Sequence, residues 1–398
     1  MSARDTICAY ADHQESVYRQ IALDIHAHPE VSNYEFFACE RLSKQLEAEG
    51  FSVTTDVAGH RTGFSAVYKA GKPGPVLVFL AEYDALVGLG HGCGHNLFGA
   101  TSCLAAASLK QVIDEVGGEI RVYGTPGEEG GENGSAKGSF VREGFFNDVD
   151  AALCVHPGDR NEASSKNIAC APMDIEFWGK PSHAAAAPEK GINALDALIL
   201  TYNGINALRQ HVTSDVRIHG IITHGGDAPN IVPAYASAKF YFRAAVVPTL
   251  EALCKRIEKI VEGAALMTGA KGSIKPSQNR VNNMVPTPSF DSVYGKEFEL
   301  LSGESIRFSD GCGIGSSDVG NVSQVVPTIQ PTICITDKPT PWHTEESKAA
   351  AKSEKGLASI VLGAKALALT ALDLIEDPAL LRQIKEDHEK AVAEQQPA

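Results

Sequence analysis

Residues 76–113 read VLVFLAEYDALVGLGHGCGHNLFGATSCLAAASLKQVI, and this stretch decides the fold of the 398-residue chain. Its first five residues are all apolar, which is typical of a strand that is buried on both faces. The polar loop Glu82–Gly94 follows, and the Ala- and Leu-rich segment Leu97–Ile113 then predicts a helix. A strand, a loop and a helix in succession form the repeating unit of a parallel α/β sheet.

The same succession recurs further along the chain. Glu119–Tyr123 predicts a second strand, which leads into a glycine-rich turn that carries Glu128 and Glu129. A third apolar strand is expected at Ala151–Val155 and ends at His156. Open α/β sheets bind their ligands beyond the carboxyl ends of the strands. The sequence therefore predicts that these polar residues gather at one edge of a central, mostly parallel sheet.

The pattern of elements changes from about residue 171. A strand, a helix, two strands, a helix and a strand are predicted in that order, at residues 173–178, 192–210, 216–223, 235–243, 250–264 and 272–276. This is the order of the ferredoxin-like split βαβ unit. We therefore predict an inserted α+β domain at residues 171–280, and a discontinuous catalytic domain at residues 1–170 and 281–398. The length of the chain also favours two domains.

Composition limits the partners of the chain. Hydrophobic residues make up 43% and charged residues 21% of the sequence, which is ordinary for a soluble globular protein. The formal net charge is −14, and no run of basic residues occurs. Nucleic acids and anionic membranes are bound through clustered Lys and Arg side chains. We therefore expect neither as a partner.

The sequence also predicts a cytoplasmic location. The N-terminal residues contain no apolar segment of a signal peptide, and the nine cysteines form no CxxC pair. Such cysteine usage is typical of reduced thiols. The longest apolar segment, Gly356–Ile375, contains Lys365 and Asp373. A membrane span needs about 18 uncharged apolar residues, so this segment predicts a buried helix.

The run HGCGHN places Cys93 and His95 two residues apart between glycines. In extended backbone, side chains at i and i+2 point the same way, so both could reach one metal ion. A thiolate with an imidazole suits Zn²⁺ better than Mn²⁺ or Co²⁺. Taken alone, the run is equally compatible with a glycine loop that holds a buried thiol and a capping histidine.

Glu128 and Glu129 are adjacent, so their side chains diverge. One could bind a metal ion while the other acts as a base, because a divalent ion lowers the pKa of bound water from about 15.7 towards about 7. An isolated Glu pair is more often exposed in a polar turn. His156 ends a strand and His343 lies in the loop PWHTEE. A single histidine in such a place is usually structural, so the interpretation depends on convergence.

Several motifs extend the argument to nearly the whole chain. They follow one another as HAHPE, AEYDALVGLGHGCGHN, GTPGEEGG, VHP, GKPSHAAAAPEKGINALDA, GGDAPNIVP, GSSDVGNVS and WHTEE. On these motifs the chain resembles the M20 family of dinuclear metallopeptidases and amidohydrolases, the aminoacylase, carboxypeptidase and hippurate hydrolase type. HGCGHN and GSSDVG resemble most the branch that contains the B subunit of aminobenzoyl-glutamate hydrolase.

The resemblance implies roles for individual residues. Two divalent ions, Zn²⁺ or Mn²⁺ with Co²⁺ possible, would be held by Cys93, His95, Glu129, His156 and His343. Glu128 would be the general base, and Asp84 would orient a ligand histidine. In the inserted domain, His183 would polarise the scissile carbonyl, from its own or the partner subunit. The residues implied to bind substrate are Asn230, Arg243, Ser316 and Ser317.

The chain departs from the family pattern at one position. Many relatives begin the first metal motif with His-x-Asp, whereas this chain has Glu82-Tyr83-Asp84. Glu82 is therefore not assigned as a ligand, and the occupancy of the second metal site stays open. The resemblance also implies a homodimer formed through the inserted domain, which would close over the site.

The leading hypothesis is metal-dependent hydrolysis of an amide bond in an N-acyl amino acid or a dipeptide-like substrate. A non-catalytic protein that binds a metal or a small molecule is the alternative from another class, although such a binder has no need for Glu128. A cysteine hydrolase that uses Cys93 with His95 is a third hypothesis. Neighbouring loop positions seldom give the hydrogen bond that such a pair needs. The acyl and amine parts of the substrate are not fixed by the sequence.

Overall fold

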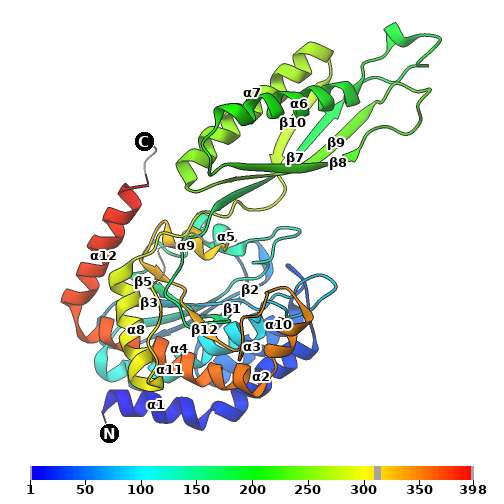
Figure 1. Cartoon of the computed structure of the whole chain (residues 1–398). Coiled ribbons are helices and arrows are strands. Elements are labelled where there is room, and N and C mark those ends of the chain that lie inside the picture. Colours follow the sequence, from blue (N-terminus) through cyan, green and yellow to red (C-terminus); the bar gives the residue numbers. More distant parts are fainter. Residues whose placement is uncertain (1, 309–314, 396–398) are drawn as a thin grey trace. The chain divides into compact units, whose positions relative to one another are not determined.

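A computed structural model of the chain describes residues 2–308 and 315–395 (Figure 1). It forms two compact units. Unit 1 contains the described residues up to Asn167 together with Met284–Glu394, and unit 2 contains Ile168–Asn283. The inserted domain predicted at residues 171–280 falls inside unit 2. The two units are described separately below.

Unit 1 is built on a six-stranded sheet in the order β1-β2-β4-β3-β5-β11. The strands are β1 Ser52–Val57, β2 His60–Lys69, β3 Val76–Ala81, β4 Glu119–Gly124, β5 Ala151–Leu153 and β11 Thr328–Ile329. Strands β4, β3, β5 and β11 are parallel, and the hairpin β1–β2 adds an antiparallel edge. A separate short parallel pair is formed by β6 His156–Gly158 and β12 Thr332–Cys334. Along the chain, β6 follows β5 and β12 follows β11. The predicted α/β class with a mostly parallel sheet is confirmed.

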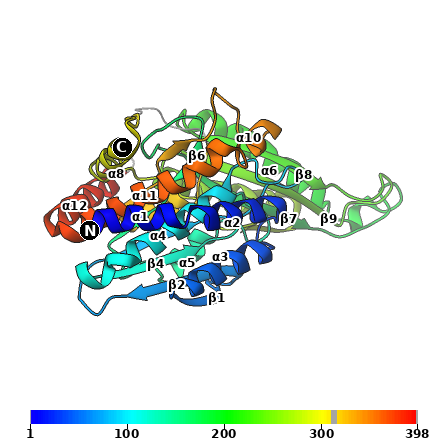
Figure 2. The ribbon, with the colours of Figure 1, turned by 90° about the horizontal axis from the view of Figure 1, so that it is seen from below.

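Helices cover both faces of this sheet. They are α1 Ala3–His13, α2 Glu15–Ala27, α3 Phe36–Ala48, α4 His95–Val116, α5 Ala136–Arg142, α8 Pro288–Ser302, α9 Val319–Ser323, α10 Glu345–Ala350, α11 Glu354–Glu376 and α12 Pro378–Ala393. Helix α4 packs on β3 and β4, and α1, α2 and α11 pack on α4 (Figure 2). Residues of α5 and α9 form a second core with Val78 and Leu80 of β3. Strand β3 is therefore buried on both faces, as its apolar run predicts.

Helix α11 is the predicted buried helix. Within the described ranges it is the one helix that is long and apolar enough to cross a membrane, yet 78% of that apolar window is buried inside the protein. It packs against α4 and α8 in the main core. Its apolar composition is thereby explained as that of a core helix.

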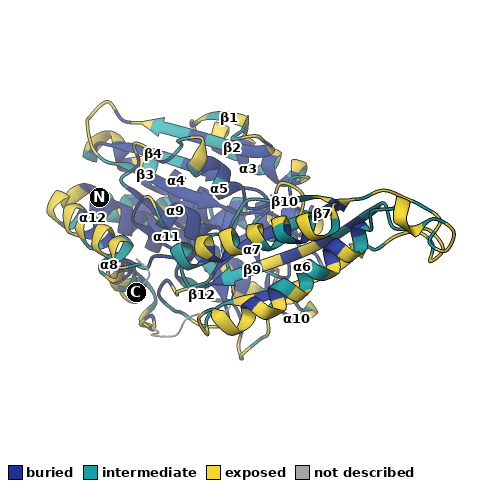
Figure 3. Ribbon diagram, turned by 90° about the horizontal axis from the view of Figure 1, so that it is seen from above, coloured by how far each residue is buried: buried dark blue, intermediate teal, exposed yellow. Residues whose placement is uncertain are grey.

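Unit 2 is a four-stranded antiparallel sheet in the order β10-β7-β9-β8. Its elements are β7 Ala169–Trp178, α6 Ala194–Leu208, β8 Arg217–His224, β9 Tyr235–Ala244, α7 Val247–Thr268 and β10 Lys271–Pro276. Helices α6 and α7 pack on one face of the sheet, and their outward faces are exposed (Figure 3). The predicted ferredoxin-like α+β domain is confirmed.

Candidate metal and catalytic centre

The predicted metal ligands come from four loops of unit 1. Cys93 lies at the end of the loop after β3, and His95 is the first residue of α4. Glu129 lies in the loop after β4, His156 begins β6, and His343 lies in the loop before α10. Gly94, at φ +80°, makes the sharp entry into α4, and a Cβ there would be only 3.0 Å from Pro157. Glycine is therefore required between the two ligands of this loop.

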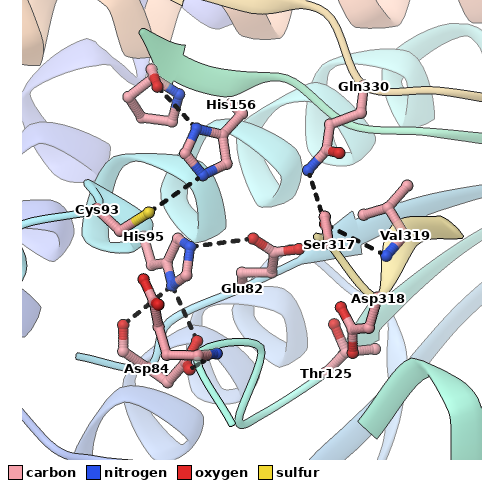
Figure 4. A network of polar contacts seen from close by, with 12 residues as sticks. Glu82, Asp84, Cys93, His95, Thr125, His156, Ser317, Asp318, Val319 and Gln330 are labelled. Carbon is pink, nitrogen blue, oxygen red and sulfur yellow. Dashed lines mark hydrogen bonds and ion pairs between the residues drawn. The ribbon is translucent and has the colours of Figure 1, made fainter. Parts of the chain in front are cut away.

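The structure brings all of these side chains together, and Figure 4 shows Cys93, His95 and His156 side by side. Three groups of donors have their ligand atoms within 4.8 Å of one another. The groups are Cys93, His95 and His156; Cys93, Glu129 and His343; and His95, Glu128 and Glu129. They share Cys93, His95 and Glu129, so they form one continuous cluster. A cluster with this many donors would offer ligands for more than one divalent cation.

Separations between donors fit binding to a common cation. Cys93 Sγ lies 3.5 Å from Nε2 of His156, and Nε2 of His343 lies 3.4 Å from Oε1 of Glu129. Two nitrogen or oxygen donors at about 2.1 Å from a tetrahedral ion are about 3.4 Å apart, and a sulfur–nitrogen pair is about 3.5 Å apart. These contacts therefore have the spacing that a divalent ion imposes on its ligands.

Two of the predicted histidine ligands have Nδ1 within hydrogen-bond distance of an oxygen atom. Nδ1 of His95 lies 2.9 Å from Oδ1 of Asp84, and Nδ1 of His156 lies 2.7 Å from the carbonyl oxygen of Pro157. A histidine whose Nδ1–H is donated to an oxygen presents Nε2 as the ligand. Asp84 therefore has the position expected of a residue that orients a ligand histidine.

Buried donor atoms without hydrogen bonds mark the same place. Nε2 of His95 and Oε1 of Glu129 are buried and form no hydrogen bond of good geometry to a described residue; they make ion-pair contacts, to Glu82 at 3.3 Å and to His343 at 3.4 Å respectively. A buried polar atom without a partner costs about 1–3 kcal/mol, so such atoms are expected where a further group binds. The residues present thus fit a bound divalent cation.

Glu128 and Glu129 differ in their electrostatic surroundings. His343, His95 and Cys93 outweigh the effect of burial and lower the pKa of Glu129 to about 2. Burial and the negative charges of Glu82 and Glu129 raise the pKa of Glu128. The neighbouring imidazoles and the thiol thus favour ionised Glu129, as a ligand requires, while Glu128 has the greater affinity for a proton.

A buried ion-pair network adjoins the cluster, and the sequence analysis did not predict it. The ammonium of Lys137 lies 2.8 Å from Oε1 of Glu82 and 2.6 Å from Oδ1 of Asp318, and all three side chains are fully buried. The other oxygen of Glu82 lies 3.3 Å from Nε2 of His95. Glu82 therefore links the network to a predicted metal ligand.

Ser316 and Ser317 belong to the segment before α9. The hydroxyl of Ser317 accepts a hydrogen bond from the backbone N–H of Val319 at 3.4 Å and lies 3.4 Å from Nε2 of Gln330 (Figure 4). Its neighbour Asp318 pairs with Lys137. The first residues of the motif GCGIGSSDVG, 311–314, lie outside the described residues. A substrate role for the two serines stays a prediction.

His183, Asn230 and Arg243 all lie in unit 2. The backbone N–H of Ala184 donates to the carbonyl oxygen of Asn230 at 3.0 Å, so His183 and Asn230 belong to paired segments beyond one end of β7 and β9. Arg243 lies near the other end of β9, beside His219. At about 3.3 Å per residue, about 26 Å of strand separates Arg243 from the end nearer Asn230. Arg243 and Asn230 of the same subunit are therefore too far apart to bind the same small chemical group of a substrate.

Comparisons with known proteins agree with this architecture. The family model of the peptidase dimerisation domain matches residues 166–267. The chain is 36% identical over 386 residues to the Xaa-Arg dipeptidase of Mus musculus, covering 92% of this chain and 88% of that protein. It is 33% identical over 461 residues to the B subunit of the p-aminobenzoyl-glutamate hydrolase of Escherichia coli strain K12, covering 97% and 94%.

A solved structure shows the same fold. A dinuclear metal-binding peptidase of the M20 family from Bacillus subtilis superimposes with a TM-score of 0.62 and 19% identity, over 91% of this chain and 99% of that one. The resemblance of the motifs is thus confirmed over nearly the whole length. The chain belongs to the M20 peptidase family and is a hydrolase of amide or peptide bonds.

Proposed function

We propose that this enzyme hydrolyses the amide bond of an N-acyl amino acid or a dipeptide-like substrate with the help of two divalent cations. The observation that supports this proposal is the gathering of a thiol, three imidazoles and Glu129 from four loops around one cluster, with Glu128 beside it. A protein that only binds a metal or a small molecule has no use for a second carboxylate there. Membership of a family of hydrolases also favours catalysis over that alternative.

The cations would be held by Cys93, His95, Glu129, His156 and His343. When bound, they supply acidification of water and polarisation of the substrate carbonyl. Glu128 takes a proton from the attacking water on its carboxylate and passes it to the nitrogen of the leaving amine. Asp84 holds the ring of His95 in the orientation that leaves Nε2 free. The thiolate favours Zn²⁺, and Mn²⁺ or Co²⁺ are further candidates.

The substrate would be held from unit 2. We propose that His183 stabilises the negative charge that develops on the carbonyl oxygen, the largest contribution in many hydrolases. Arg243 suits the substrate carboxylate because it can form two parallel hydrogen bonds. Asn230, Ser316 and Ser317 are proposed as further substrate contacts. The names of two relatives, an Xaa-Arg dipeptidase and a p-aminobenzoyl-glutamate hydrolase subunit, support dipeptides and acylated glutamate as candidate substrates.

We propose that the enzyme is a cytoplasmic homodimer joined through unit 2. Each of the eight cysteines within the described ranges is a free thiol, as suits a reducing compartment. The match to a dimerisation domain, residues 166–267, lies almost entirely in unit 2. Contribution of Asn230 and Arg243 by different subunits would reconcile their separation along β9 with action on one substrate.

Strand β8 is the proposed contact between subunits. It is one of the two outer strands of the unit 2 sheet, and Ile221 and Ile222 on it are 63% and 46% exposed. An exposed apolar edge strand is a ready template for pairing with another chain. We expect Ile221→Lys to convert the dimer to a monomer in light scattering coupled to size exclusion. Leu266→Lys, at an exposed apolar position on α7, should leave the dimer intact; loss of the dimer in both variants, or in neither, would contradict this contact.

Metal dependence tests the proposed function most directly. Treatment with EDTA should abolish hydrolysis of N-acyl amino acids and dipeptides in a substrate screen, and added Zn²⁺ or Mn²⁺ should restore it. A cysteine hydrolase based on Cys93 would keep its activity after complete removal of the metal. Full activity of the metal-free protein would therefore contradict the proposed function. Iodoacetamide labelling of Cys93 before and after metal addition gives an independent readout, since a bound cation should protect the thiol.

A further inference from the structure

The loop between α2 and α3 contacts the turn that carries Glu128, and the proposed function gives this loop no role. Nδ2 of Asn33 donates to the carbonyl oxygens of Glu132 and Asn133 at 2.9 and 2.8 Å. Gly127, at φ +68°, fits against Ser32, whose hydroxyl would be 2.5 Å from a Cβ at that position. The loop follows directly on the HAHPE motif. It is therefore in contact with the glycine-rich turn along most of the length of that turn.

Glu35, at the end of the same loop, makes the most specific of these contacts. Its side chain is fully buried. Oε1 accepts a hydrogen bond from the backbone N–H of Gly127 at 2.9 Å, and Oε2 accepts one from the hydroxyl of Thr62 on β2 at 2.8 Å. The carboxyl group of Glu35 thus connects Gly127, the residue immediately before Glu128, to strand β2 through two hydrogen bonds.

A second buried carboxylate fastens the residue immediately after Glu128. Oδ2 of Asp84 accepts a hydrogen bond from the backbone N–H of Glu129 at 2.9 Å. Glu128 therefore lies between two peptide N–H groups, and each is held by a carboxylate from a different part of the chain. Two fixed points on either side of one residue define the direction in which its side chain leaves the backbone.

The surroundings of Glu35 disfavour the ionised form of its carboxyl group. Burial, and then the negative charge of Asp84, raise the pKa of Glu35 to about 8. A backbone N–H in a turn can be satisfied by water or by a neutral hydroxyl at no such cost. The fold nevertheless places a long acidic side chain there, with both oxygens in use.

We infer that Glu35 is a positioning residue for catalysis, which acts through the N–H of Gly127 to aim Glu128 at the metal cluster. This inference rests on the proposed function, in which Glu128 moves the proton. Glu35 contacts neither the ligand set nor a substrate position in the described structure. Its effect should therefore fall on the chemical step, because a displacement of about 1 Å at a reacting group can cost roughly 100-fold in rate.

Three variants of Glu35 separate positioning from charge and from bulk. Glu35→Gln keeps an oxygen at the correct reach for the Gly127 N–H, so we expect kcat within about threefold of the parent. Glu35→Asp keeps the carboxyl group but shortens the side chain, and Glu35→Met removes the acceptor. For both we expect kcat to fall roughly 10- to 100-fold, with KM and bound metal per subunit close to the parental values.

Thr62→Val is the matched control, because it removes the other hydrogen bond of the same carboxylate and leaves the Gly127 contact in place. It should lower thermal stability with little change in kcat. Parental kcat in Glu35→Asp, a variant that keeps the buried carboxyl group and is the safest to fold, would overturn the inference. So would equal losses of kcat in Thr62→Val and Glu35→Asp. A Glu128→Gln enzyme that still turns over would instead overturn the proposed function.

Discussion

Replacing Glu128 with Gln is expected to lower kcat by about 10²- to 10⁴-fold, the usual contribution of a general base, while the metal content stays at the parental value. Gln has the size and shape of Glu but cannot hold a proton at its side-chain oxygen under working conditions. Glu128 belongs to one of the three donor groups, whereas Glu129 belongs to two and lies 3.4 Å from His343. The two neighbours should therefore respond differently.

Glu129→Gln is the matched comparison for this experiment. It makes the same replacement, a carboxylate by an amide, at the next residue of the same turn. We expect it to lower the metal bound per subunit as well as the activity. Steady-state kinetics on the best substrate of the screen, together with metal analysis by mass spectrometry, distinguish the two outcomes. Metal loss in Glu128→Gln, or undiminished kcat with full metal content, would contradict its role as base.

The fold was predictable because its central signals are local. The run at Val76–Leu80 is apolar at every position, and in the structure Leu77 and Phe79 belong to the main core while Val78 and Leu80 belong to the second core. The hairpin β1–β2 was not predicted. Strand β1 has the sequence SVTTDV and is largely exposed, so it lacks the apolar alternation that marks a strand. It pairs with β2 across the short turn at residues 58–59, but the sequence of β1 offers no buried apolar face that would mark it as a strand.

The candidate site was predictable only in part, for the same physical reason. Cys93 and His95 are two residues apart, and their residue types are those of metal ligands. Lys137 and Asp318 are 181 residues apart, and neither forms a recognisable motif with the other. A single lysine in the polar segment GSAKGSF looks like an exposed residue. Only the fold shows that it is completely buried between two carboxylates.

Replacement of Lys137 with Met is expected to destabilise unit 1 by about 3–5 kcal/mol, the cost of removing one partner from a buried ion pair. Burial opposes the charge of Lys137, but the carboxylates of Asp318 and Glu82 outweigh it and raise its pKa. The methionine side chain has a similar length and fills the space without a charge. Two buried carboxylates then face each other without a cation, beside the acidic residues of the metal site.

The two tryptophans make this measurement specific to one unit. Trp178 lies in β7 of unit 2, and Trp342 packs against the main core of unit 1. In a Trp178→Phe background, fluorescence during urea unfolding reports unit 1 alone. The comparison is made on metal-free protein, so that loss of stability is not confused with loss of bound cations.

Charge balance, rather than packing, is the cause that this experiment isolates. If the uncompensated carboxylates destabilise Lys137→Met, then neutralising them in the triple variant Lys137→Met, Glu82→Gln, Asp318→Asn should recover a large part of the lost stability, although more native side chains have been removed. If packing of the lysine stem were the cause, the triple variant would be no more stable than the single one. Recovery in the triple variant and deep destabilisation in the single one would together establish that Lys137 acts as the fixed counter-ion of Glu82 beside the metal ligands. A midpoint for Lys137→Met within error of the parent would refute that role.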